Sequence, residues 1–152
     1  MRHIAQLFDL AGALVIMAFG TQANAASPGF AAPDMDYIRV APSEQMDLRE
    51  ALASDRWQSL ENESPNFGYI RDTVWLRVPV SAIPGDRKLL EIRYPQLDDV
   101  TFYLMENGAF RQRLSTGDRL PFTQRQIQHR NFLFSFETYP QNDYQVLLRI
   151  RT

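Results

Sequence analysis

A two-residue alternation of apolar and polar or mixed side chains dominates the chain from Val74 onward. Because successive side chains of a strand point to opposite faces of a sheet, this period is typical of half-buried β-strands and not of helices. Each run has one continuous apolar face. The runs are Val74–Val80, Leu89–Tyr94, Val100–Met105, Asn131–Phe136 and Tyr144–Arg151.

Turn signals between these runs indicate how the strands connect. Asn107-Gly108 precedes a further short strand at Phe110–Leu114, and this dipeptide strongly favours a tight β-hairpin. An earlier strand is predicted at Tyr37–Val40, and the only helix is expected near residues 47–54 with Asp47 as its cap. The pattern predicts an all-β fold, an antiparallel β-sandwich or jelly roll with one short helix.

The N-terminus has the three-part layout of a secretory signal peptide. Arg2 and His3 precede an apolar stretch, Leu10–Phe19, and Ala23-Asn24-Ala25 supplies small residues for cleavage. The stretch is too short to cross a bilayer core of roughly 30 Å as a helix. Asp9 weakens the pattern, and an uncleaved membrane anchor is the alternative.

Cleavage after Ala25 would leave 127 of the 152 residues. We expect a flexible leader over residues 26–36 and one domain over residues 37–152. The net charge of −2 gives no general reason to expect nucleic acid as a partner, and the chain has no cysteine. Arginine outnumbers lysine by 15 to one, which suits recognition of carboxylates and hydroxyls but is also explained by a GC-rich genome.

Catalytic and metal-binding groups are scarce. His129 is the single histidine after the leader, and no neighbouring residues have the spacing of a metal site. Neither a nucleophile elbow nor a phosphate-binding glycine loop occurs. Asp98-Asp99 is explained by a turn between strands. We therefore predict no enzyme activity, no cofactor and no metal.

Two regions carry candidate ligand-binding residues. The second face of the strands bears Trp75, Arg77 and Tyr103, which could form an exposed aromatic platform or ordinary cross-strand packing. Trp57, which follows the predicted helix, is expected in the core.

The other region is the long connection Thr116–Asn131, because loops held by a rigid scaffold often carry binding residues. Its candidates are Arg125, His129, Arg130 and Asn131. The structural alternative is that Asp118 pairs with a neighbouring arginine and that the loop side chains satisfy backbone groups.

Several short motifs follow one another in a specific order along the chain. They are Phe67-Gly68-Tyr69, Val74–Arg77, Leu90–Pro95, Leu97–Val100, Gly117-Asp118, Pro121-Phe122, Arg125 and His129–Phe132. In order and spacing they resemble the type 2 extracellular domain of bacterial receptors with seven transmembrane helices and diverse intracellular signalling modules (7TMR-DISM). The resemblance covers the chain from about Tyr37 to Thr152.

The resemblance implies a periplasmic jelly roll similar to carbohydrate-binding modules, without catalytic residues. It implies a receptor in the inner membrane, whose seven-helix region feeds a kinase or diguanylate cyclase. It also implies at least one more strand after Thr152, so the chain is expected to be a fragment. The expected partners are a small-molecule or glycan ligand and the downstream receptor modules.

The leading functional expectation is a sensor in which a sugar ring stacks on Trp75 or Tyr103 while arginine and amide groups bind its polar atoms. Forked arginine contacts favour acidic sugars or other anions. One alternative is an interaction module that contacts another protein or a second copy as a homodimer. Another is a glycan-active enzyme, which needs two carboxylates about 5 to 10 Å apart across a cleft.

Overall fold

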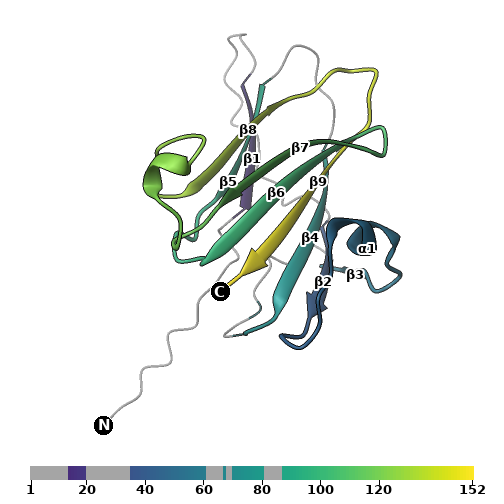
Figure 1. The fold of residues 1–152 in the computed structure, drawn as a ribbon. Helices are drawn as coiled ribbons and strands as arrows, with labels where there is room; N and C mark the ends of the chain where they lie inside the picture. The colour runs from purple at the N-terminus through teal and green to yellow at the C-terminus, as the bar shows by residue number, and fades with distance from the viewer. Residues whose placement is uncertain (1–13, 20–34, 61–66, 68–69, 81–86) are drawn as a thin grey trace.

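The computed structural model describes residues 14–19, 35–60, 67, 70–80 and 87–152. Two antiparallel sheets stack face to face, which confirms the predicted sandwich (Figure 1). The strands are β1 (Leu14–Phe19), β2 (Asp36–Val40), β3 (Gln58–Ser59), β4 (Thr73–Val80), β5 (Arg87–Ile92), β6 (Asp99–Glu106), β7 (Ala109–Thr116), β8 (Phe132–Glu137) and β9 (Tyr144–Arg151).

One sheet has six strands in the order β3-β2-β4-β9-β6-β7, and the other has three in the order β1-β5-β8. All five alternating runs form strands, as predicted. β5 starts earlier than expected and ends at Ile92, so Arg93 and Tyr94 lie outside it. The reason is that the chain turns here to cross from the three-stranded sheet to β6 in the other sheet.

β1 comes from the segment predicted to be the signal peptide. It pairs antiparallel with β5, with Leu14 opposite Ile92 and Phe19 opposite Arg87. Cleavage after Ala25 would therefore remove β1 and leave β5 at the sheet edge. Residues 1–13 and 20–25 of the predicted signal peptide, and residues 26–34 of the predicted flexible leader, lie outside the described residues.

The last two residues assigned to the flexible leader belong to the fold. Met35 is buried in the core between the sheets, and Asp36 begins β2. The predicted strand at Tyr37–Val40 is otherwise confirmed. β2 pairs with β4 along its whole length, which fixes the N-terminal strand in the six-stranded sheet.

The main core lies between the two sheets. Phe102 of the six-stranded sheet stacks on Phe134 of the other, with ring centroids 5.0 Å apart, and Phe136 packs against the same ring at 5.5 Å. These positions belong to the alternating apolar faces of their strands. Burial of such large rings from both sheets supplies much of the hydrophobic stabilisation of a sandwich.

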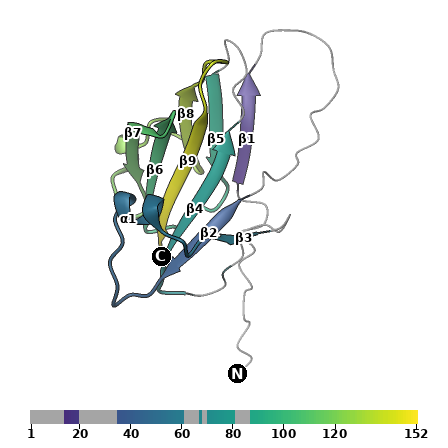
Figure 2. The same cartoon turned by 90° about the vertical axis from the view of Figure 1, so that its right-hand side faces the viewer.

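A second, smaller core lies on the other face of the six-stranded sheet, under α1 (Leu48–Ala53) (Figure 2). Asp47 caps the helix as predicted: its side chain accepts from the Glu50 N–H, while the Glu50 carboxylate accepts from the Asp47 N–H. The helix places the buried Ala51 against the sheet. Leu48 of the helix, together with Met46 before it and Trp57 after it, also packs against this smaller core.

The predicted hairpin between β6 and β7 is confirmed. Asn107 and Gly108 both adopt positive φ, 51° and 76°, as a two-residue hairpin turn requires. Next to the turn the register shifts, because Leu104 faces Gln112 whereas Met105 faces Phe110. Arg111 is the extra residue of this β-bulge, and a bulge changes the direction in which a side chain points.

Candidate functional site

The predicted aromatic platform is covered in this structure. Trp75 has no exposed surface and Tyr103 is 6% exposed; their rings stack with centroids 5.6 Å apart in the core under α1. The expectation of an exposed face is therefore corrected. The physical reason is that the second face of these strands is itself apolar enough to be buried by a helix.

Arg77 is engaged within the fold as well. Its Nη2 lies 2.6 Å from a carboxylate oxygen of Asp36, and its guanidinium lies 4.4 Å from the centre of the Trp57 ring. Trp57 is half-buried against the smaller core and donates from Nε1 to the carbonyl of Ala51. These contacts tie β2, β4 and the segment after α1 together.

The long connection from β7 to β8 is anchored at its start to the turn between β5 and β6. The Asp118 N–H donates to the Leu97 carbonyl at 2.8 Å, and Arg119 forms an ion pair of 2.8 Å with Asp98. Arg119 therefore pairs with Asp98, and the expected pair between Asp118 and Arg119 is wrong. The connection includes a short 3-10 helix, η2 (Phe122–Gln124).

The Arg125 side chain links the middle of this connection to its C-terminal end. Its Nη1 donates to the carbonyls of His129, at 2.5 Å, and Arg130, at 2.9 Å. The guanidinium lies between the rings of Phe122 and Phe132, 4.8 and 4.6 Å from their centres. The Arg125 side chain thus fixes the shape of the loop by binding the loop's backbone carbonyls.

Asn131 bonds through its side chain to the buried carboxylate of Glu91 and through its backbone to His129. Asn131 Nδ2 donates to Glu91 at 2.6 Å, and the Asn131 N–H donates to His129 Nδ1. Burial raises the pKa of Glu91, but hydrogen bonds from Asn131 and Arg93 and the nearby positive charges outweigh it, so the pKa falls below its ordinary value. His129 and Arg130 are exposed and do not line the grooves described below.

The Gln126 side chain binds the outer edge of β8 as a neighbouring strand would, through backbone hydrogen-bonding groups. Its side-chain amide donates to the Ser135 carbonyl at 3.0 Å and accepts from the Ser135 N–H at 2.7 Å. Free strand edges are prone to unwanted pairing, so this amide protects the middle of the edge. It also bridges the loop to β8 beside the opening between the two sheets.

A groove of about 460 Å³ lies at that opening, between β7 and β8. This volume falls within the range of roughly 300 to 1,000 Å³ that is usual for small-molecule sites. Leu104 and Phe136 are the deeply buried members of its lining. We call it the β7–β8 groove; its lining residues are Arg87, Leu104, Arg111, Gln112, Gln126, Ile127, Ser135, Phe136 and Glu137.

Gln126 also borders a smaller hollow of about 130 Å³, and there Arg125 contributes to the wall. Arg125 is thus the one predicted site residue that lines either cavity among the described residues. The alternation of β7 and the arginine excess were the available signals for Arg111 and Gln112. Neither signal shows that β7 and β8, which belong to different sheets, border one groove.

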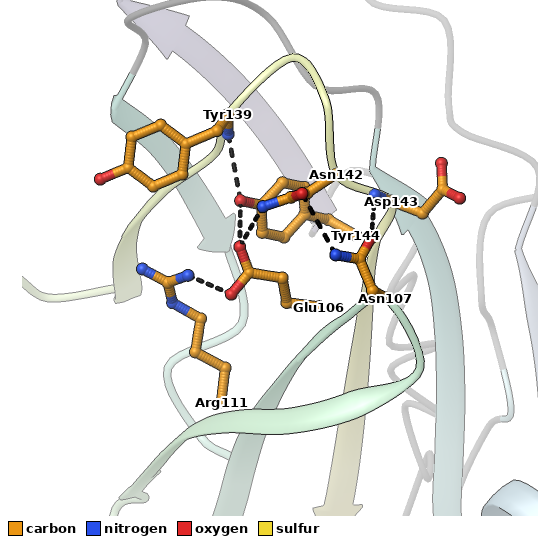
Figure 3. Close-up of polar contacts among 7 residues, drawn as sticks. All are labelled: Glu106, Asn107, Arg111, Tyr139, Asn142, Asp143 and Tyr144. Carbon is orange, nitrogen blue, oxygen red and sulfur yellow. Dashed lines mark hydrogen bonds and ion pairs between the residues drawn. The ribbon is translucent and has the colours of Figure 1, made fainter.

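Arg111 is held at the end of the groove by a polar cluster around Glu106 (Figure 3). The Glu106 carboxylate also accepts from Tyr144 Oη and Asn142 Nδ2, each at 2.7 Å. Asn107 bonds to Asn142, so the cluster joins the β6–β7 hairpin to the β8–β9 loop. The hydrogen bond from Tyr144, and then that from Arg111, hold the pKa of Glu106 below its ordinary value of 4.5.

We expect this cluster to make stability depend on pH. Since the folded-state pKa of Glu106 is lowered, its ionised form adds stability above about pH 4.5, and that contribution is lost as the pH falls through the folded-state pKa. Urea denaturation at neutral and acidic pH should therefore show a smaller acid-induced loss in Glu106→Gln than in the wild type. Tyr144→Phe should be intermediate, and an unchanged loss in Glu106→Gln would contradict this role.

Charges in the groove are balanced. Arg111 pairs with Glu106, and Arg87 lies 3.5 Å from Glu137 in an exposed, loosely held pair. Glu137 is the single carboxylate among the residues that line the groove as described. The groove therefore lacks the two facing carboxylates of a glycoside hydrolase. No group of three or more potential metal ligands occurs within the described residues.

Two antiparallel sheets stacked face to face define the class of β-sandwich modules. Within that class, residues 32–152 match the family described as 7TMR-DISM extracellular 2, and the chain belongs to this family. It is thus an extracellular sensor domain of a signalling receptor. No curated protein matches the chain. In the part of the chain that the structure describes, no helix is long and apolar enough to cross a membrane.

Proposed function

We propose that this domain is exported by its N-terminal leader to the periplasmic side of the inner membrane and binds a small molecule in the β7–β8 groove. Binding there would control the downstream modules of the receptor. The observation that carries the proposal is the groove itself: it has the volume of a ligand site, a buried apolar floor and several side-chain donors.

The ligand that suits this groove is a neutral molecule with many hydroxyl groups, such as a carbohydrate. Gln112 and Arg87 offer amide and guanidinium donors, and Glu137 offers an acceptor, so a diol could be bound through both of its oxygens. The two arginines already have carboxylate partners. The balanced charge therefore favours a neutral sugar over the acidic one that the arginine content alone suggested.

The test is calorimetry of the chain with soluble neutral oligosaccharides, followed by the variants Gln112→Ala and Arg87→Ala. Each should weaken binding about fivefold, because each removes one net hydrogen bond worth on the order of 1 kcal/mol. Arg113→Ala is the matched control: Arg113 neighbours Gln112 on β7 but lies 5.8 Å from the Tyr103 ring and does not line the groove. If all three variants bound the ligand with equal affinity, the ligand would not bind in the β7–β8 groove.

The alternative of a protein-interaction module rested on an exposed face of Trp75, Arg77 and Tyr103. Two of these side chains are buried under α1, and the third is held by Asp36 and Trp57. The rings of Trp75 and Tyr103 are therefore not available to a partner on that face. A homodimer stays a prediction, and light scattering of the purified chain measures it directly.

A further inference from the structure

We propose that one end of the sandwich, where the β7–β8 connection begins, docks on a membrane surface that carries anionic lipid headgroups. We call it the loop end. It combines exposed arginines that form no ion pair within the described residues with exposed apolar side chains on one loop. The proposal concerns a surface separate from the β7–β8 groove.

Strand register places these segments at the same end. Val100 of β6 faces both Thr116, the last residue of β7, and Ile150 near the end of β9. Thr152 donates from its hydroxyl to the Ile70 carbonyl, so the segment entering β4 lies there too. The turn from β5 joins through the contact of Asp118 with Leu97.

Three arginines at the loop end are exposed and form no ion pair with the residues that the structure describes: Arg71, Arg130 and Arg151. Arg119 adds a 73% exposed side chain, although it pairs with Asp98. Asp118 is also exposed there and offsets one positive charge. With the pairs Arg119–Asp98 and Arg149–Asp99 counted, the described residues of the loop end still carry an excess of positive charge, in a chain whose net charge is −2.

The β7–β8 connection adds apolar groups to this positive surface. Leu120 is 37% exposed and Phe122 is 49% exposed, and both follow within six residues of the end of β7. A further anchor holds the start of this loop, since the Arg119 N–H approaches the Asp98 carbonyl at 3.4 Å. The apolar side chains are thus presented by a loop tied to the sandwich.

Exposed leucine and phenylalanine beside arginine are the combination that binds the interface of an anionic bilayer. The rings and alkyl groups enter the headgroup boundary while the guanidinium groups pair with lipid phosphates. The family assigns the domain to the outer side of a membrane receptor, so a bilayer is its neighbour. This favours lipid over a soluble acidic protein as the partner.

The test is flotation of the full chain with vesicles of phosphatidylglycerol and phosphatidylethanolamine, compared with vesicles of phosphatidylcholine. The double variant Leu120→Ser/Phe122→Ser and the triple variant Arg71→Gln/Arg130→Gln/Arg151→Gln are the probes. Phe110→Ser is the apolar control, because Phe110 is 56% exposed beside the hairpin at the opposite end of β7. Arg49→Gln/Arg113→Gln is the charge control. Every variant is compared with the wild type as the same full chain, in which Leu14–Phe19 of the leader form β1 and pair with β5.

We expect binding to the anionic vesicles that weakens at high ionic strength and falls about fivefold for each arginine replaced at the loop end. The apolar double variant should also lose at least fivefold, with both controls close to wild type. Melting temperatures identify any variant that fails to fold, and the single Leu120→Ser variant then replaces the double. Equal binding by probes and controls, or equal binding to phosphatidylcholine, would overturn the proposal without affecting ligand binding in the groove.

Discussion

Replacing Trp75 with alanine is expected to lower the free energy of unfolding by about 3–5 kcal/mol, the usual cost of removing a large aromatic ring from a core. Trp75 is fully buried, and its ring stacks on Tyr103 between the six-stranded sheet and α1. A six-residue helix cannot collapse into the space without losing its other contacts. Chemical denaturation followed by tyrosine and tryptophan fluorescence measures the change.

Trp75→Phe is the informative companion. The indole Nε1 of Trp75 is buried without a hydrogen-bond partner among the described residues. Phenylalanine keeps most of the ring and removes that unsatisfied donor, so we expect a much smaller loss than for alanine. If Trp75→Ala kept nearly wild-type stability, the ring would not be a core residue, and the exposed platform would be restored as a ligand site.

Gly117→Ala is expected to cost about 3 kcal/mol, at the upper end of the usual range for an overpacked position. A Cβ at this position would lie 2.0 Å from the Asp98 carbonyl oxygen and 2.9 Å from the Asp99 Cα. Both are backbone atoms, so no side chain can move aside. The β5–β6 turn and the start of the β7–β8 connection would have to separate.

Gly108→Ala is the matched control in the other turn of β7. No atom lies within 4 Å of a Cβ built at Gly108, so the cost comes only from its φ of 76° and should be about 1 kcal/mol. Thermal unfolding of the two variants compares them directly. Equal melting temperatures would show that the backbone of Gly117 does not lie against the Asp98 carbonyl as the structure places it.

Local signals predicted the elements of the fold well. The two-residue alternation located β4, β6, β8 and β9, since a strand buried on one face must alternate. Asn107-Gly108 predicted the hairpin because both residues tolerate positive φ. The side chain of Asp47 predicted the start of α1 for a similarly local reason, because a cap bonds within its own turn.

The burial of the second sheet face could not be predicted in the same way. Trp75 and Tyr103 alternate with core residues, and their spacing is the same whether that face meets solvent, a ligand or a helix. Whether that face is buried depends on where α1 packs, which is a property of the tertiary structure. A short helix between β2 and β3 gives no sequence signal of the surface that it covers.

The β7–β8 groove could not be predicted from the sequence for a related reason. Arg87 begins β5, Arg111 lies on a bulge of β7, and Ser135 lies in β8, so only the stacking of two sheets brings them together. The candidates in the β7–β8 connection have structural partners within the fold. Arg125 bonds to carbonyls of its own loop, and Asn131 bonds to Glu91. Loop composition alone does not separate residues that shape a loop from residues that face a ligand.

The most direct test of the central claim is to map ligand contacts by amide chemical shifts during titration with neutral oligosaccharides. If the β7–β8 groove is the sensing site, the largest changes should fall on Arg111, Gln112, Gln126 and Ser135, while Trp75 and the amides of α1 stay near their starting positions. Changes centred on Trp75, Tyr103 and α1, with none along β7 and β8, would contradict the account.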